Sequence, residues 1–464
     1  MKTLIAAMLL LGASPAGTAP DVALSRIDAD YQVNVGIADA IWKLAELGYQ
    51  EKRSSALLQK RLKDNGFTVT AGVAGMETGF IASWSNGAGP AIGLLGEFDA
   101  LPGLSQTTDP VKTPRAGSDN GHGCGHHLFS VASISAAIAI RDWMKATGTT
   151  GTIRFYGTPA EENGAGKVRM LRAGLFKDLD IVLHWHPGNE NAADMLTTNT
   201  NISAKFRFHG VAAHAAGAPE MGRSALDGVE AMNMMSEMLR EHVPQETRIH
   251  YVITAGGKVP NIVPDFAETD YFVRHPDPAA AGDTVERLVK IAKGAAMGTG
   301  TTVDYDIDDS VLSLLPNRTL QTLIHEKLSQ VGGVTYTPEE TSYAQKIIAS
   351  LDGTKAKPGD AEQVQPLKEL HIAGSTDVGD VSWNVPTGGF FTATWVPGTS
   401  AHSWQAVAAG GMSIGMKGMQ NAAKVLALTA IELLEKPEIV RAAKAEFEDR
   451  RGKDFTYPQG EVAQ

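Results

Sequence analysis

The order of the expected strands and helices changes in the middle of this 464-residue chain. Residues 200–309 give the order strand, helix, strand, strand, helix, strand, beginning with the alternating pattern NISAKFRFHG. That order is the split βαβ arrangement of a ferredoxin-like domain. One hydrophobic core seldom spans a chain of this length, so two domains are expected. We therefore interpret residues 200–309 as a second, α+β domain inserted into the first.

The segments on either side of this insertion alternate between strands and helices. The run AIGLL (91–95) is continuously apolar, which is typical of a strand buried on both faces of a sheet. Residues 30–64 and 128–146 show the spacing and composition of helices. The alternation predicts an α/β domain with a largely parallel sheet flanked by helices. In such domains functional residues gather just beyond the strand ends.

The charge of the chain argues against a nucleic-acid partner. The formal net charge is -11, and no cluster of lysine and arginine forms a basic stripe. The N-terminus has a different character, because Lys2 precedes an apolar run (4–13) that is too short to span a bilayer. Ala16 and Ala19 follow as possible cleavage points. This pattern predicts a signal peptide over residues 1–19 and export, to the periplasm, with no integral membrane segment.

The only cysteine, Cys124, lies in the glycine-rich stretch GHGCGHHLF (121–129), together with three histidines. Thiolate and imidazole are both ligands of zinc, which makes a metal site one interpretation. A second interpretation is a thiol hydrolase, with Cys124 as nucleophile and a histidine as base. A third is a non-catalytic metal-binding or solute-binding protein. An internal disulfide is excluded, because there is no second cysteine.

Further candidate ligands follow the expected strands elsewhere in the chain. Glu161 and Glu162 come after the strand TIRFYGTPA, His186 follows another strand in HWHPG, and His402 lies in the turn GTSAHSWQ. Two adjacent glutamates point in different directions, so one can bind metal while the other carries a proton. A cysteine nucleophile would leave the glutamates and His402 unused, and a binding protein would need no spare carboxylate. The set therefore favours a metal-dependent hydrolase.

Several blocks occur in the order known from one family of enzymes. The segments GHGCGHHL, PAEENGAGK, LHWHPG, AAHAAGAPEMGRSALD, LPNRTL, STDVGDVSW and GTSAHSWQ closely resemble amidohydrolases of the aminobenzoyl-glutamate hydrolase type. These belong to the aminoacylase and carboxypeptidase G2-like clan of di-metal peptidases. The resemblance implies one catalytic α/β domain made of residues 20–199 and 310–464. It also implies that residues 200–309 form a lid that mediates homodimerisation.

The resemblance assigns roles to individual residues. It implies two divalent metal ions, and the thiolate ligand favours zinc, with manganese as the alternative. His184 is an alternative ligand to His186. His127 stands where the family usually has Asp or Asn, so it adjusts the surroundings of the metal ligands, is a further ligand or is a surface imidazole, and for His122 the surface interpretation is preferred. The implied site consists of Cys124 as bridging ligand, His126, Glu162, His186 and His402 as ligands, Glu161 as general acid/base, Asp99 as support for the metal site, His214 reaching the partner's active site, and Asn261 and Arg274 receiving the substrate carboxylate.

These assignments imply an exported amidohydrolase. It would cleave an N-acyl amino acid that has an aromatic or bulky acyl group and a free carboxylate. The attacking group would be a metal-activated water, with Glu161 as its base. A dipeptidase or carboxypeptidase of the same clan is the alternative.

Overall fold

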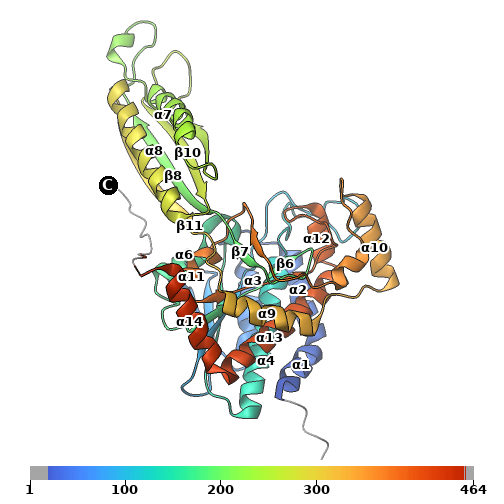
Figure 1. Ribbon diagram of the computed structural model, residues 1–464. Helices are drawn as coiled ribbons and strands as arrows, with labels where there is room; N and C mark the ends of the chain where they lie inside the picture. Colours follow the sequence, from blue (N-terminus) through green and yellow to red (C-terminus); the bar gives the residue numbers. More distant parts are fainter. Residues whose placement is uncertain (1–18, 454, 456–464) are drawn as a thin grey trace, which may run out of the picture.

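The structure is a computed structural model that describes residues 19–453 and residue 455. Figure 1 shows a broad domain from which a narrower, elongated domain projects. Residues 1–18, which hold most of the expected signal peptide, lie outside the described residues. Within the described part of the chain, no helix has the length and apolar character needed to cross a membrane.

The broad domain contains a six-stranded sheet with the order β1-β2-β4-β3-β5-β13. Strands β4, β3, β5 and β13 are parallel to one another, whereas β1 and β2 pair antiparallel, so the sheet is mixed. The carboxyl ends of β4, β3 and β5 consequently meet at one edge. The strands are β1 (Thr68–Ala71), β2 (Phe80–Ser85), β3 (Ala91–Gly96), β4 (Thr152–Gly157), β5 (Ile181–Leu183) and β13 (Thr387–Gly388).

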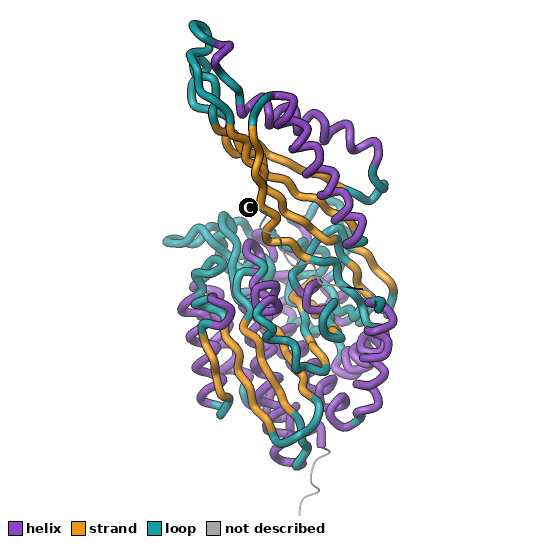
Figure 2. The backbone as a smooth tube through the Cα atoms, turned by 90° about the vertical axis from the view of Figure 1, so that its left-hand side faces the viewer, coloured by secondary structure: helices purple, strands orange, loops and turns teal. Residues whose placement is uncertain are grey.

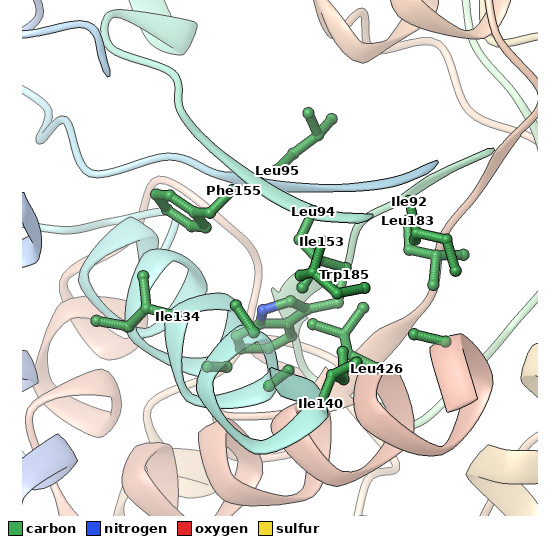
Figure 3. Close-up of a cluster of buried hydrophobic side chains, with 14 of the residues drawn as sticks. Ile92, Leu94, Leu95, Ile134, Ile140, Ile153, Phe155, Leu183, Trp185 and Leu426 are labelled. Atoms are coloured by element: carbon green, nitrogen blue, oxygen red, sulfur yellow. The ribbon is translucent and has the colours of Figure 1, made fainter. Parts of the chain in front are cut away.

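Two long helices form the centre of the core. Helix α4 (His126–Thr147) is buried over most of its surface, and it packs against α13 (Ser413–Glu435) and against β3 and β4. Figure 3 shows Leu94 and Ile153 of the sheet in one buried cluster with Ile140 of α4 and Leu426 of α13. A helix that is apolar on all sides needs such a covered position, which explains its alanine- and isoleucine-rich sequence.

The helical region expected over residues 30–64 is interrupted. Helix α2 (Tyr31–Leu44) ends at Ala45, whose φ of 41° is left-handed, and α3 (Lys52–Asp64) begins only after a loop. Apolar spacing continues across this loop, so periodicity alone did not show the break. The remaining helices of the broad domain are α1 (Ala19–Ala29), α5 (Glu161–Gly164), α6 (Gly166–Arg172), α9 (Arg318–Val331), α10 (Pro338–Ala349), α11 (Val378–Ser382), α12 (Trp404–Gly410) and α14 (Pro437–Arg451).

Two short parallel pairs lie beside the main sheet. Strand β6 (His186–Gly188) pairs with β14 (Phe391–Ala393), and β7 (Met195–Thr197) pairs with β12 (Glu369–His371). The run GGFFTATWVPG (388–398), whose composition suggests one strand, is divided between the end of β13 and β14.

The projecting domain has the predicted ferredoxin-like order of elements. Its sheet has the strand order β11-β8-β10-β9, with every pair antiparallel. Ala204, Phe206 and Phe208 of β8 are buried in the core of this domain, and Figure 2 shows both helices on one face of the sheet. We call this unit the inserted domain. It consists of β8 (Thr200–His209), α7 (Ala225–Leu239), β9 (Arg248–Ala255), β10 (Phe266–His275), α8 (Pro278–Thr299) and β11 (Thr302–Val311).

Candidate metal centre

The candidate site forms at the edge where the parallel strands end. Glu97 and Asp99 follow β3, Glu161 follows β4 after a short turn, and His186 follows β5. Because these three strands are neighbours in the order β4-β3-β5, their carboxyl ends bring the acidic residues and the imidazole to one place.

The glycines around Cys124 allow the chain to approach its neighbours closely. A Cβ on Gly121 would lie 2.1 Å from the carbonyl oxygen of Leu104. Gly125, with φ of 72°, is the left-handed residue before α4, and a Cβ there would lie 2.7 Å from Pro187. Glycine tolerates both the close approach and the positive φ. Cys124 is thereby held beside the first residue of α4, His126.

Two groups of potential metal ligands share the cysteine. Ligand atoms of Cys124, His126 and His186 all lie within 4.8 Å of one another, and so do those of Cys124, Glu162 and His402. His402 Nε2 lies 2.9 Å from Cys124 Sγ and 3.3 Å from Glu162 Oε2. A thiolate common to both groups has the position needed to bridge two ions.

The unpaired atoms of this cluster fit divalent cations. Asp99 Oδ1 lies 2.9 Å from Nδ1 of His126 and orients the ring. His126 Nε2 is buried and makes no hydrogen bond to any described residue, although Glu97 Oε2 lies 3.0 Å away. Glu162 Oε1 is also buried and unpaired within the described ranges. A thiol, imidazoles and a carboxylate are the donor types that zinc prefers, and a carboxylate behind a ligating histidine is the usual support.

The Cys124 thiol has little of the character of a catalytic nucleophile. Its side chain is buried, and burial raises the pKa of the Cys124 thiol well above its usual value. A reactive cysteine instead has a lowered pKa and an accessible sulfur atom.

Glu161 occupies a different position from Glu162. One of its carboxylate oxygens lies within 4.8 Å of ligand atoms of Glu97 and His126, and its side chain also lines an open cavity. Burial, together with the negative charges of Glu97 and Asp377, raises the pKa of Glu161 well above its ordinary value. A carboxyl group with a raised pKa beside a cavity suits proton transfer.

A buried ion-paired group lies behind Glu161 and was not predicted from the sequence. Lys167 Nζ lies 2.6 Å from Glu97 Oε1 and 2.6 Å from Asp377 Oδ1, and all three side chains are almost completely buried. Burial alone would lower the pKa of Lys167, but the carboxylates of Asp377 and Glu97 hold it above its usual value. Lys167 and Asp377 stand in PAEENGAGK and STDVGDVSW, two of the segments that carry the family resemblance, and this was the available signal.

The other histidines near Cys124 lie outside the two ligand groups, and two of them contact backbone carbonyl oxygens. His127 belongs to none of the ligand groups among the described residues, and it is not a surface imidazole, because its ring is buried with Nε2 3.0 Å from the carbonyl oxygen of Gly410. The surface interpretation is also wrong for His122, whose buried ring lies 3.1 Å from the carbonyl oxygen of Ile41. His184 lines a separate small cavity and belongs to neither ligand group.

A cavity separates the glutamate pair from the inserted domain. Its volume is about 440 Å³, and its walls include Glu161 and Glu162 on one side and Asn201, Lys205 and Arg274 on the other. Arg274 Nε is buried and has no hydrogen-bond partner in the part of the chain that the structure describes. The guanidinium of Arg274 is thus available to an anionic group in the cavity.

The structure does not bring His214 and Asn261 to this cavity. Both are exposed, and they meet at the far tip of the inserted domain, where Ala215 N donates to the carbonyl oxygen of Asn261. Strand β8 has 10 residues, so at roughly 3.3 Å per residue the tip lies about 30 Å beyond its start. Asn261 and Arg274 consequently lie at opposite ends of β10 and cannot meet in one protomer.

Comparisons with known proteins extend over nearly the whole chain. Residues 196–298 match the peptidase dimerisation domain family. The chain is 42% identical to one component of the p-aminobenzoyl-glutamate hydrolase of Escherichia coli (strain K12), over 88% of this chain and 90% of that protein. It is 29% identical to Xaa-Arg dipeptidase of Mus musculus, over 92% of this chain and 91% of that protein.

Solved structures share the fold. A dinuclear metal binding peptidase of the M20 family from Bacillus subtilis has a TM-score of 0.61 and 18% identity, covering 88% of this chain and 99% of its own. An aminobenzoyl-glutamate utilization protein from Klebsiella pneumoniae also has a TM-score of 0.61 and 18% identity, covering 84% of this chain and 97% of its own.

Proposed function

Because this chain belongs to the M20 family of metal-dependent peptidases and amidohydrolases, we propose that it hydrolyses N-acyl amino acids with a free carboxylate. The acyl group that we propose is aromatic or bulky, as the name of the Escherichia coli relative suggests. The observation that carries the proposal is the pair of ligand groups joined at Cys124, with Glu161 beside them and a cavity in front.

The two ligand groups would hold two divalent cations. When bound, these cations would lower the pKa of a water molecule and polarise the amide carbonyl. Cys124 would bridge them, with His126 and His186 on one side and Glu162 and His402 on the other. The thiolate ligand makes zinc our first candidate, and manganese is the alternative.

Glu161 would carry the proton during hydrolysis. It takes the proton from the attacking water and then donates it to the nitrogen of the leaving amine, so that the two products separate. Asp99 fixes the ring of His126, and its other oxygen accepts from the backbone N–H of Glu162 at 3.0 Å. This one carboxylate thereby fixes both the ring of His126 and the turn that carries Glu162.

The free carboxylate of the substrate would bind in the cavity. Arg274 offers a guanidinium there, and guanidinium recognises carboxylate through paired hydrogen bonds. We also propose that His214 of the partner subunit completes the site by donating to the oxyanion that forms on the carbonyl. Asn261 of the partner subunit, at the same tip, would help to hold the substrate carboxylate.

The proposal is tested with a substrate panel and metal depletion. N-aroyl and N-acyl amino acids, dipeptides and carboxyl-amidated controls are assayed for amine release, before and after complete chelation and after re-addition of zinc or manganese. We expect release from N-aroyl amino acids that requires metal and is weak for amidated controls. A preference for dipeptides would favour the dipeptidase alternative, and activity that survives full metal removal would refute the proposal.

Export to the periplasm and homodimerisation are further proposals. Export is supported by the sequence of residues 1–19, and dimerisation by the matched dimerisation domain family. N-terminal sequencing of protein from the periplasmic fraction tests the first, since we expect a start near residue 20. Sedimentation of the purified protein tests the second, and a monomer at micromolar concentration would contradict it.

A further inference from the structure

The turn that carries both glutamates has an unfavourable backbone. Ala160, directly before Glu161, has φ of 57° and ψ of 45°, which is the left-handed conformation. A residue with a Cβ adopts this conformation rarely, and it persists only where the surrounding structure holds it. The orientation of Glu161 and Glu162 therefore depends on whatever fixes Ala160.

A buried carboxylate from a distant segment holds that residue. Glu51 is fully buried, and its Oε1 accepts a hydrogen bond of 2.9 Å from the backbone N–H of Ala160. Its Oε2 accepts from the hydroxyl of Thr78, also at 2.9 Å. On the other side of the turn, Asp99 accepts from the N–H of Glu162. The turn is thus anchored at both ends by side-chain carboxylates.

The loop that leads to Glu51 also packs directly on the turn. The hydroxyl of Tyr49 donates to the carbonyl oxygen of Gly164, and a Cβ on Gly164 would lie 2.3 Å from the Tyr49 ring. A Cβ on Gly48 would lie 2.1 Å from Asn163 Oδ1. Residues 48–51 therefore pack closely against residues 160–164, and the turn cannot shift without displacing them.

We propose that Glu51 is a positioning residue for the hydrolysis, because it holds the turn that presents Glu161 to the cavity and Glu162 to the metal centre. The proposal rests on the proposed function for the roles of those two glutamates. It assigns a task to the loop between α2 and α3, outside the segments that supply the ligands.

The task needs hydrogen-bond acceptors rather than a charge. Burial and the nearby Asp99 raise the pKa of Glu51 to about 7, so a neutral side chain is compatible with this position. A glutamine has the same length, keeps an oxygen for the N–H of Ala160, and can donate its amide hydrogen to Thr78. Glu51→Gln should consequently keep the turn in place, whereas Glu51→Ala leaves the N–H of Ala160 without its acceptor.

A matched control is available elsewhere in the chain. Glu340, in the first turn of α10, is also buried, and it accepts hydrogen bonds from the N–H of Thr337 and from Lys417 of α13. Glu340→Ala removes a buried carboxylate that, like Glu51, accepts from a backbone N–H and from a hydroxyl, that of Ser413, and that also pairs with Lys417, but it does not touch the turn. Any general loss of stability should appear in both alanine variants.

The experiment compares hydrogen exchange with steady-state kinetics. In the metal-free protein, backbone amides over residues 158–165 should exchange at least about tenfold faster in Glu51→Ala than in wild type, and at the wild-type rate in Glu340→Ala. In the metal-loaded protein, Glu51→Ala should lose about 10²-fold in kcat with little change in KM, which is the scale of a small misplacement of reacting groups. Glu51→Gln should stay close to wild type in both measurements.

Two results would overturn the proposal. One is faster exchange in Glu51→Ala without loss of kcat, and the other is an equal loss of kcat in Glu340→Ala.

If Glu51→Ala does not fold, Tyr49→Phe is the second variant, because it removes only the hydroxyl that holds Gly164. It should show faster exchange over the same residues and a smaller loss of kcat, and wild-type values for both would also overturn the proposal. The exchange measurement needs no substrate, so a wrong proposed function would leave its result intact.

Discussion

Mixed dimers of two inactive variants test where His214 acts. The tip that carries His214 lies beyond the far end of β8, and the cavity beside Glu161 lies at the start of that strand. Ten residues of strand place about 30 Å between the tip and the end of the cavity next to Glu161, far more than a histidine side chain can span. If His214 is needed for turnover, it must therefore serve the active site of the other protomer.

The expected recovery follows from counting sites. Glu161→Ala and His214→Ala should each be nearly inactive alone. When the two chains are unfolded, mixed in equal amounts and refolded, random pairing in a two-fold dimer makes about half of the dimers mixed. Each mixed dimer has one site with Glu161 from one chain and His214 from the other. About a quarter of wild-type activity should return, because half of the dimers regain one site of two.

The assay needs a control for refolding and chain exchange. A mixture of Glu161→Ala with Glu162→Ala forms the same kinds of dimer, but each site still lacks one glutamate, since both act on their own chain. This mixture should stay inactive. Mixed dimers are shown directly by carrying different affinity tags on the two chains. If purified mixed dimers of Glu161→Ala and His214→Ala are no more active than the control, the placement of His214 across the interface is wrong.

Three further changes test other parts of the site. Glu161→Gln should keep its metal and lose about 10²–10⁴-fold in kcat, whereas Glu162→Gln should lose metal, and equal metal loss measured in both would contradict the division of roles. Arg274→Ala should raise KM for substrates with a free carboxylate and hardly change it for amidated ones, so an equal effect on both kinds of substrate would show a structural role. Lys167→Met should destabilise the protein by about 3–5 kcal/mol in chemical denaturation, because it leaves buried carboxylates unpaired. Lys327→Met, which breaks a less buried ion pair, is its control and should cost clearly less.

The candidate ligands stand in recognisable local settings, and the resemblance to the amidohydrolase family selected His126 and Glu162 among them. Cys124 lies between two glycines and His126 follows the second of them, Glu162 and His186 follow strands, and His402 lies in a turn. The structure places ligand atoms of all five in two groups around Cys124. Their roles as ligands remain predictions until metal is measured in variants.

The buried charges behind the site could not be predicted in the same way. Lys167 stands in a helical stretch, where a lysine normally faces water, and its partners Glu97 and Asp377 come from distant segments. Only the folded chain shows that the three meet without solvent. Local periodicity carries no information about such pairing, because burial of a lysine depends on charges that lie far away in the sequence.

The choice between His184 and His186 could not be made from their positions along the strand. In one continuous strand, residues two apart project from the same face, so both imidazoles would point the same way. Strand β5 ends at Leu183 and β6 begins at His186, but backbone pairing continues between them, because His184 N donates to the carbonyl oxygen of Gly388 and His186 N to that of Phe390. His186 lies with Cys124 and His126, whereas His184 lines another cavity.

The two ends of the inserted domain join the broad domain close to each other. Asn201 at its start pairs directly with Val311 at its end, because β8 and β11 are neighbours in its sheet. Insertions whose two ends lie close together are well tolerated by a host domain, since the host backbone hardly has to adjust. The inserted domain can therefore be exchanged as a unit, and related enzymes could acquire a longer or shorter one without altering a single metal ligand. The length of the inserted domain and the chemistry at its base can therefore evolve separately.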